Sequence, residues 1–272
     1  MKLRHLALLG GLFAAGIIGF VPVRLPAAEP AKPAQSAISE EAAAALSRMG
    51  QTLRAEQLSF QARTIRVYAD PDGEPLHIFH VLKVTMHRPN RLLAEVSGDD
   101  GSNKLVFDGK TAIIFSAEQN KYASIAVREG TIAGMLKEAV GRLGVDFPLA
   151  DFLSDEPGKA FLTGVTSGRV VNTVTIDGAP YDHLFFFQPP GIELELWLSK
   201  NEQSLPRRLI VTYRSLPGEP NFVATFSNWN FSVHPADSDF VFTPPPGAVQ
   251  VALKPPAAAK PGTKAKPAGT AK

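Results

Sequence analysis

Glu193 and Glu195 are the residues of this sequence whose type and spacing come nearest to a catalytic pair. They lie two positions apart where acidic and apolar residues alternate, so in a strand their side chains share one face with Cβ atoms about 7 Å apart. Two carboxylates at such a separation could hydrolyse a glycosidic bond by acid–base chemistry. Alternation in a half-exposed strand produces the same pair, and we therefore interpret both glutamates as a solvated outer face.

The histidines do not form a metal-binding or acid–base pattern. His77 and His80 are three positions apart in an expected strand and therefore point to opposite faces, which is unsuitable for zinc. Asp182 and His183 are adjacent and also diverge, so we interpret His183 as a structural, hydrogen-bonded residue. The chain lacks the glycine and serine patterns of nucleotide-binding and hydrolase sites. We predict no catalytic residue, no metal and no cofactor, and hence a protein that is not an enzyme.

The N-terminus has the features of a secretory signal. Lys2 and Arg4 precede an apolar run from Leu6 to Phe20, which is shorter than the roughly 20 residues that a spanning helix needs. Residues 1–28 are the predicted signal peptide, with cleavage expected after Ala28. Because the A-x-A pattern is missing there, an uncleaved anchor stays open as an alternative. The sequence thus predicts export to the periplasm.

Composition limits the possible partners. The chain has no Cys, which excludes disulfides, thiolate chemistry and lipidation of a cysteine. It has 28 basic and 26 acidic residues, but three of the cations belong to the signal and five to the last residues. The remaining body is acidic, and we predict no binding to nucleic acid. Residues 252–272, rich in Lys, Pro and Ala, are predicted to be a disordered tail that could contact anionic membrane or cell wall.

The central part of the chain has the pattern of one β-rich domain, residues 39–251, after a Pro- and Ala-rich linker at residues 29–38. A helix is predicted from Ser39 to about Gln57, because Ser39 can cap it and apolar residues follow at helical spacing. A second helix is predicted after Thr131. Strands are expected at residues 58–69, 76–86, 91–96, 104–107, 111–115, 122–127, 169–176, 182–188, 192–198, 208–213 and 222–231. Such a series of strands separated by turns predicts an α+β fold with a large, twisted antiparallel sheet.

Several short motifs carry a resemblance to a known family. They are Asp108-Gly109-Lys110-Thr111, Pro148-Leu149-Ala150-Asp151, Asp182-His183-Leu184, the strand of Trp197, Pro206-Arg207-Arg208 and Trp229-Asn230. In this order they resemble an uncharacterised family of predicted periplasmic proteins, domain of unknown function 2092. That family is similar to the LolA and LolB lipoprotein carriers. The resemblance implies an open half-barrel whose concave apolar face is covered by the N-terminal helix and the mid-chain helices and accepts acyl chains.

The hairpin around Pro189-Pro190-Gly191 then becomes the expected ligand site. Apolar residues alternate with acids after the turn, whereas the run before it, Leu184 to Phe187, is apolar on both faces. Which of the two pairs in that run faces inward depends on the loop register, which the sequence leaves open. As cavity-lining residues we take Leu194, Leu196, Leu198, Phe185 and Phe187 from the hairpin, with Met135 and Leu136 from a helix that could act as a lid.

Three functions from different classes follow from these observations. The first is a soluble, non-catalytic periplasmic binder of a lipid or of the acyl chain of a lipoprotein, in transport or sensing. The second is a structural or protein-interaction module whose concave face is filled by its own helices. The third is an enzyme of unknown reaction, because a fold does not determine a function.

Overall fold

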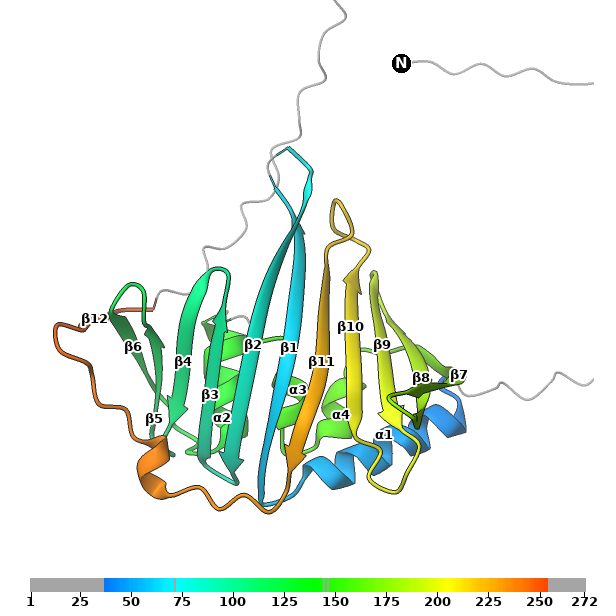
Figure 1. The fold of residues 1–272 in the computed structure, drawn as a ribbon, viewed down its shortest axis with the longest axis horizontal. Helices are drawn as coiled ribbons and strands as arrows, with labels where there is room; N and C mark the ends of the chain where they lie inside the picture. Colours follow the sequence, from blue (N-terminus) through cyan, green and yellow to red (C-terminus); the bar gives the residue numbers. More distant parts are fainter. Residues whose placement is uncertain (1–36, 71, 144, 146, 254–272) are drawn as a thin grey trace, which may run out of the picture. The chain divides into compact units, whose positions relative to one another are not determined.

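The structure is a computed structural model that describes residues 37–253 except residues 71, 144 and 146. The predicted signal peptide, most of the linker and nearly all of the cationic tail lie outside the described residues. Within the described part, the chain forms a single sheet of twelve strands with helices on one face (Figure 1).

The sheet consists of two meanders that meet at one pair of strands. Its order is β12-β6-β5-β4-β3-β2-β1-β11-β10-β9-β8-β7, so β1 pairs with β11 where the two meanders join. The strands are β1 (Gln57–Ala69), β2 (Pro75–His87), β3 (Arg91–Gly98), β4 (Gly101–Phe107), β5 (Thr111–Ser116), β6 (Lys121–Ala126), β7 (Ser167–Ile176), β8 (Ala179–Gln188), β9 (Ile192–Ser199), β10 (Pro206–Tyr213), β11 (Asn221–Asn230) and β12 (Val249–Val251).

The predicted fold class is confirmed, with one difference in strand direction. The sheet is open and curved, an α+β half-barrel, and eleven of its strands run antiparallel to their neighbours as expected. β12 was not predicted, and it pairs with β6 in the parallel direction. Three residues, all of them exposed, are too few to show a period-two pattern, which is why the sequence did not indicate this strand.

One face of the sheet is buried because apolar residues recur at every second position. In β1 the buried side chains are Leu58, Phe60 and Ala62, and in β11 they are Phe222, Ala224 and Phe226. Side chains of a strand alternate between faces, so these residues all point to the side that carries the helices. We call this the concave face and the opposite side the convex face.

The helices cover the concave face. They are α1 (Glu40–Leu53), α2 (Ile132–Leu136), the π-helix η1 (Lys137–Arg142), α3 (Ala150–Leu153) and α4 (Pro157–Phe161). The two predicted caps are present, because Ser39 Oγ accepts a hydrogen bond from the backbone of Ala42 and Thr131 Oγ1 accepts one from Gly134. The N-terminal helix and the mid-chain insert thus lie where the resemblance placed them.

α1 and α4 cross so closely that each needs a glycine at the contact. A Cβ atom added to Gly50 would lie 2.9 Å from the backbone nitrogen of Gly158, and one added to Gly158 would lie 2.8 Å from the carbonyl oxygen of Leu46. Side chains cannot occupy these positions without displacing a backbone. The two glycines therefore determine how tightly the helices seal the sheet.

A segment after β11, residues 231–248, runs along the end of the sheet where β2, β3 and β4 turn and then past β5 and β6, and we call it the strap (orange in Figure 1). It contains the 3-10 turn η2 (Asp237–Phe240), in which Phe240 is fully buried. Farther along, Phe242 lies 5.4 Å from both Phe115 and Tyr122, measured between ring centroids. The strap thus covers part of the convex face, an arrangement that the sequence did not predict.

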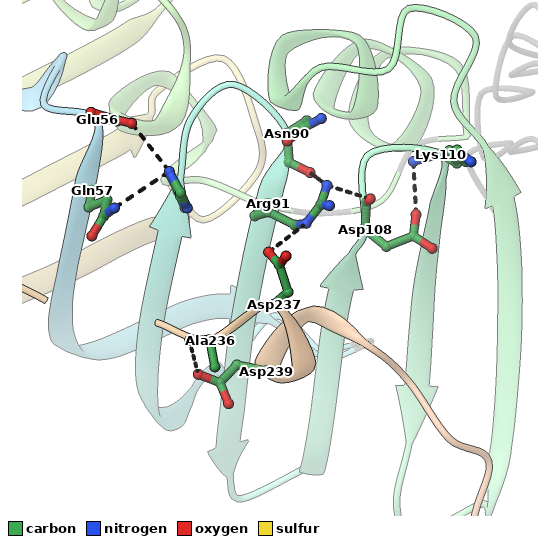
Figure 2. Close-up of polar contacts among 10 residues, drawn as sticks. Glu56, Gln57, Asn90, Arg91, Asp108, Lys110, Ala236, Asp237 and Asp239 are labelled. Carbon is green, nitrogen blue, oxygen red and sulfur yellow. Dashed lines mark hydrogen bonds and ion pairs between the residues drawn. The ribbon is translucent and has the colours of Figure 1, made fainter. Parts of the chain in front are cut away.

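Polar contacts hold the strap at the edge where β2, β3 and β4 turn (Figure 2). Arg91 donates to the carbonyl oxygen of Asp108 at 2.6 Å, and its Nε lies 3.7 Å from a carboxylate oxygen of Asp237 in η2. The carboxylate of Asp239 accepts from the backbone of Ala236 and closes the turn. Arg91 therefore links the strap to the loop between β4 and β5.

Candidate binding site on the concave face

The half of the concave face formed by β8, β9 and β10 is filled by the protein itself. Leu196 and Leu198 are fully buried and Leu194 nearly so. Phe161 of α4 packs edge-on against Phe186, with 5.6 Å between ring centroids. Met135 and Leu136 of α2 also belong to this continuous core. The predicted leucines do point inward, and they belong to the core beneath the helices.

The inward placement that we expected for Phe185 and Phe187 is wrong. Strand residues directly opposite each other share a face, and β8 pairs Phe185 with Glu195 and Phe187 with Glu193. The pair that faces the helices is Leu184 and Phe186, opposite Leu196 and Leu194, and both are fully buried. The register of the hairpin, which the sequence left open, decides between the two pairs.

Glu193 and Glu195 on the convex face both have side-chain partners. Glu193 lies 2.7 Å from Nε of Arg214, and Glu195 lies 2.8 Å from Nε2 of His183. The His183 ring stacks on Trp197 with 4.0 Å between centroids. His183 is thus hydrogen-bonded, as predicted. Within the described residues there is also no group of three His, Cys, Asp or Glu side chains that could hold a metal ion.

The part of the concave face that the helices do not fill lies over the meander that contains β1 to β6. There a cavity of about 360 Å³ lies between β1 to β5, β11 and the segment that joins η1 to α3. Apolar side chains form most of its wall: Leu82, Val96, Ile114, Phe147, Leu149 and Phe222. None of the seven residues predicted to line the site lies among those that surround this cavity. The strands that form it were predicted, but no signal in the sequence distinguishes a filled half-barrel from a hollow one.

One end of the cavity carries polar and charged groups. His80 Nε2 lies 2.6 Å from a carboxylate oxygen of Asp100, and the guanidinium of Arg66 lies over the Phe222 ring at 5.8 Å. Thr64 is buried beside them. An apolar cavity with a few convergent polar groups at one end suits an amphiphilic molecule, whose tail would be buried and whose head group would lie at the rim.

Arg88, at the turn between β2 and β3, ties two helix ends to the sheet. Its guanidinium donates to the last carbonyls of α1, at Leu53 (3.1 Å), and of α3, at Leu153 (3.2 Å). Asp155 lies 3.4 Å from the same group. Burial lowers the pKa of Arg88, while the neighbouring carboxylate opposes that shift. Since carbonyls at helix ends lack partners within the helix, this one side chain satisfies two of them.

The mid-chain insert contains a π-helical turn and forms part of the cavity wall. Residues 131–153, which we call the lid segment, contain the π-helix, where Leu143 donates to the carbonyl of Glu138. π-Helical turns are frequent at functional sites. The segment continues directly into the wall of the cavity at Phe147 and Leu149.

No described helix has the length and hydropathy needed to cross a membrane. Among proteins of curated function, none matches the chain. Similar solved structures include an uncharacterised conserved protein from Thermus thermophilus, with 11% identity, a TM-score of 0.47, and coverage of 78% of this chain and 99% of that one. LprF from Mycobacterium bovis has 13% identity, a TM-score of 0.42, and coverage of 73% and 98%.

A LolA superfamily protein from Nitrosomonas europaea is similar at 11% identity, with a TM-score of 0.38 and coverage of 74% of this chain and 97% of that one. A family model described as "Predicted periplasmic protein (DUF2092)" matches residues 42–254, nearly the whole described domain. This description agrees with the periplasmic localisation that the N-terminus predicts. The chain belongs to the DUF2092 family of predicted periplasmic proteins.

Proposed function

We propose that the protein binds a hydrophobic group, the acyl chain of a lipid or lipoprotein, in the concave cavity and acts as a non-catalytic periplasmic carrier or sensor. The observation that carries this proposal is the apolar cavity with charged groups at one end. Its volume of about 360 Å³ is near the lower limit of small-molecule sites, roughly 300–1,000 Å³. Such a space suits a single chain rather than a lipid with several chains.

The energetics favour uptake of a single chain. Burying a methylene group contributes about 0.8 kcal/mol, so eight of them contribute roughly 6 kcal/mol before the cost of opening is subtracted. Longer chains need more room than the closed state offers. We infer that movement of the lid segment extends the cavity to Met135, Leu136 and the inner leucines of β9. In this way Met135, Leu136 and the inner leucines of β9 would contact ligand only in the open state, whereas Phe185 and Phe187, on the convex face, would not.

A second function is favoured by a different observation. The half of the concave face at β8 to β10 is filled by the protein itself and leaves no room there for a ligand, as expected of a structural or protein-interaction module. The two functions differ in whether the remaining cavity takes up a ligand.

Ile114→Trp tests the proposal by filling the cavity. Ile114 lies on the cavity wall in β5, and the larger ring would occupy space that a chain needs. We expect the affinity for a fluorescent C16 fatty acid, measured by titration, to fall at least tenfold, because roughly 2 kcal/mol of chain burial is lost. The matched control is Thr212→Trp, which adds the same ring on the convex face opposite Glu193 and should leave the affinity unchanged.

Thermal unfolding of both variants separates loss of binding from loss of folding. Native mass spectrometry with lipid extraction, on protein purified from the periplasm, would identify the natural cargo. A wild-type protein that carries no acylated molecule and takes up no fatty acid would contradict the carrier function and favour the interaction module.

A further inference from the structure

The strap leaves half of the convex face uncovered. It follows the ends of the strands near η2 and then passes β5 and β6, whereas the outer surface of β2, β1, β11, β10 and β9 carries no other described segment (Figure 1). Strand pairing aligns side chains across this surface in two neighbouring rows. One row consists of Val81, Arg63, Thr225, Arg208, Trp197 and His183.

The second row is apolar along β2, β1, β11 and β10. It contains Phe79, Ile65, Val223 and Ile210, and it continues through Glu195 and Phe185 to Arg169 in β7. We call the surface formed by the two rows the arginine face. Its apolar end is the most accessible, since Phe79 is 51% and Val81 39% exposed.

The cations of the arginine face have no anionic partners within the described residues. Arg208 lies over the Trp197 ring at 5.2 Å, and Arg169 lies over the Phe185 ring at 5.1 Å. Among residues 37–253 with the three gaps given above, no carboxylate oxygen lies within 4.0 Å of these two guanidiniums or of Arg63. The acids of the same face, Glu193 and Glu195, are already paired with Arg214 and His183. The surface is therefore positive in an otherwise acidic domain.

A hollow adjoins the arginine face beside Val81. It has a volume of about 270 Å³ and is lined by Lys83, Ser97, Lys104 and Phe115. Phe115 forms its apolar wall, and the two lysines lie at its border, one of them 3.1 Å from Glu95. A space of this size accepts one large side chain, in the way that central pockets of protein interfaces hold anchor residues.

We propose that the arginine face binds an acidic, extended segment of a partner protein, with a large apolar side chain seated in the hollow beside Val81. Arginine and aromatic residues are enriched in protein interfaces, whereas lysine is depleted. The planar guanidinium binds carboxylates with two parallel hydrogen bonds, and stacking on Trp197 and Phe185 holds two of the groups in place. Cations held in place beside exposed apolar side chains are complementary to a segment in which acidic and apolar side chains alternate. An anionic membrane would contact the cations but has no group that needs the hollow.

The test uses a fluorescein-labelled twelve-residue peptide in which Glu alternates with Phe and Val, titrated against the protein without its signal peptide. We expect binding that weakens as salt rises, and a loss of about tenfold or more in the double variant Arg63→Glu and Arg169→Glu, because two attractive contacts become repulsive. The control variant Lys110→Glu and Lys121→Glu changes the net charge by the same amount at exposed positions outside the arginine face and should bind like the wild type.

Two further peptides test whether the acidic and the apolar side chains of the parent peptide are both recognised. One has Lys in place of Glu, and the other has Ser in place of Phe and Val; both should bind at least tenfold more weakly than the parent peptide. Equal losses in the two double variants, or binding to phosphatidylglycerol vesicles but not to the peptide, would overturn the proposal. Fatty acid uptake by the Arg63 and Arg169 variant should be normal, which distinguishes this surface from the concave cavity.

Discussion

Phe186→Ala is expected to lower the free energy of unfolding by about 3–5 kcal/mol, the cost typical of truncating a fully buried phenylalanine. Phe186 has no exposed surface and packs against Phe161 of α4, so its removal leaves a cavity at the contact between helix and sheet. Chemical denaturation should show the loss, and the melting temperature should fall by roughly 10 °C.

Phe185→Ala is the matched control for this prediction. The two phenylalanines are adjacent in β8, but Phe185 lies on the convex face, where it contacts Arg169. Its removal should cost about 1 kcal/mol, mostly from lost surface packing and the cation–π contact. Similar losses for both variants would mean that the register of the hairpin differs from the one described.

Arg88→Met is expected to lower the free energy of unfolding by about 3 kcal/mol. The substitution keeps much of the aliphatic volume but removes the donors for the carbonyls of Leu53 and Leu153, and two buried acceptors without partners are costly. Hydrogen exchange should accelerate at the end of α1 and throughout α3. If the proposed lid movement is correct, fatty acid should also enter faster in stopped-flow measurements, since the variant has lost a link between the insert and the sheet.

Arg91→Met provides the comparison at a nearby site. Arg91 contacts Asp108 and Asp237 at the edge of the sheet, where water can replace its hydrogen bonds, so about 1 kcal/mol or less should be lost. Hydrogen exchange in α1 and α3 should not change in this variant. An Arg88 variant with wild-type stability and exchange would show that the two carbonyls find other partners.

The sequence was sufficient to predict the elements that follow a regular pattern. The alternation in Leu76–Met86 and Phe222–Phe231 corresponds to β2 and β11 within two residues at each end, and Ser39 and Thr131 cap helices as expected. A strand that is buried on one face shows apolar residues at every second position of the sequence, and the start of a helix shows a capping residue. The strap has neither, because single residues such as Phe240 hold it to the sheet, and the sequence therefore did not indicate it.

The candidate site was less predictable than the fold. Leu194, Leu196 and Leu198 do face the helices, but the same alternation occurs in β2 and β3, where the cavity lies. Whether a concave face is hollow depends on how the covering segments pack, and a close helix contact such as that of Gly50 with Gly158 leaves no period in the sequence. The choice between Phe185 and Phe186 depended on a turn, and a shift of one residue exchanges the two faces.

The joint between the two meanders has a consequence for how the chain folds. Within each meander, neighbouring strands are close in the sequence, but the pairs from Ser59 with Asn230 to Arg66 with Phe222 join residues roughly 160 positions apart. Contacts of low sequence separation form early, and those that close a long loop form late. One edge of β1 therefore has no partner strand until β11, and with it almost the entire domain, has been synthesised. A newly secreted chain is thus most vulnerable to aggregation at β1 until β11 has been translocated.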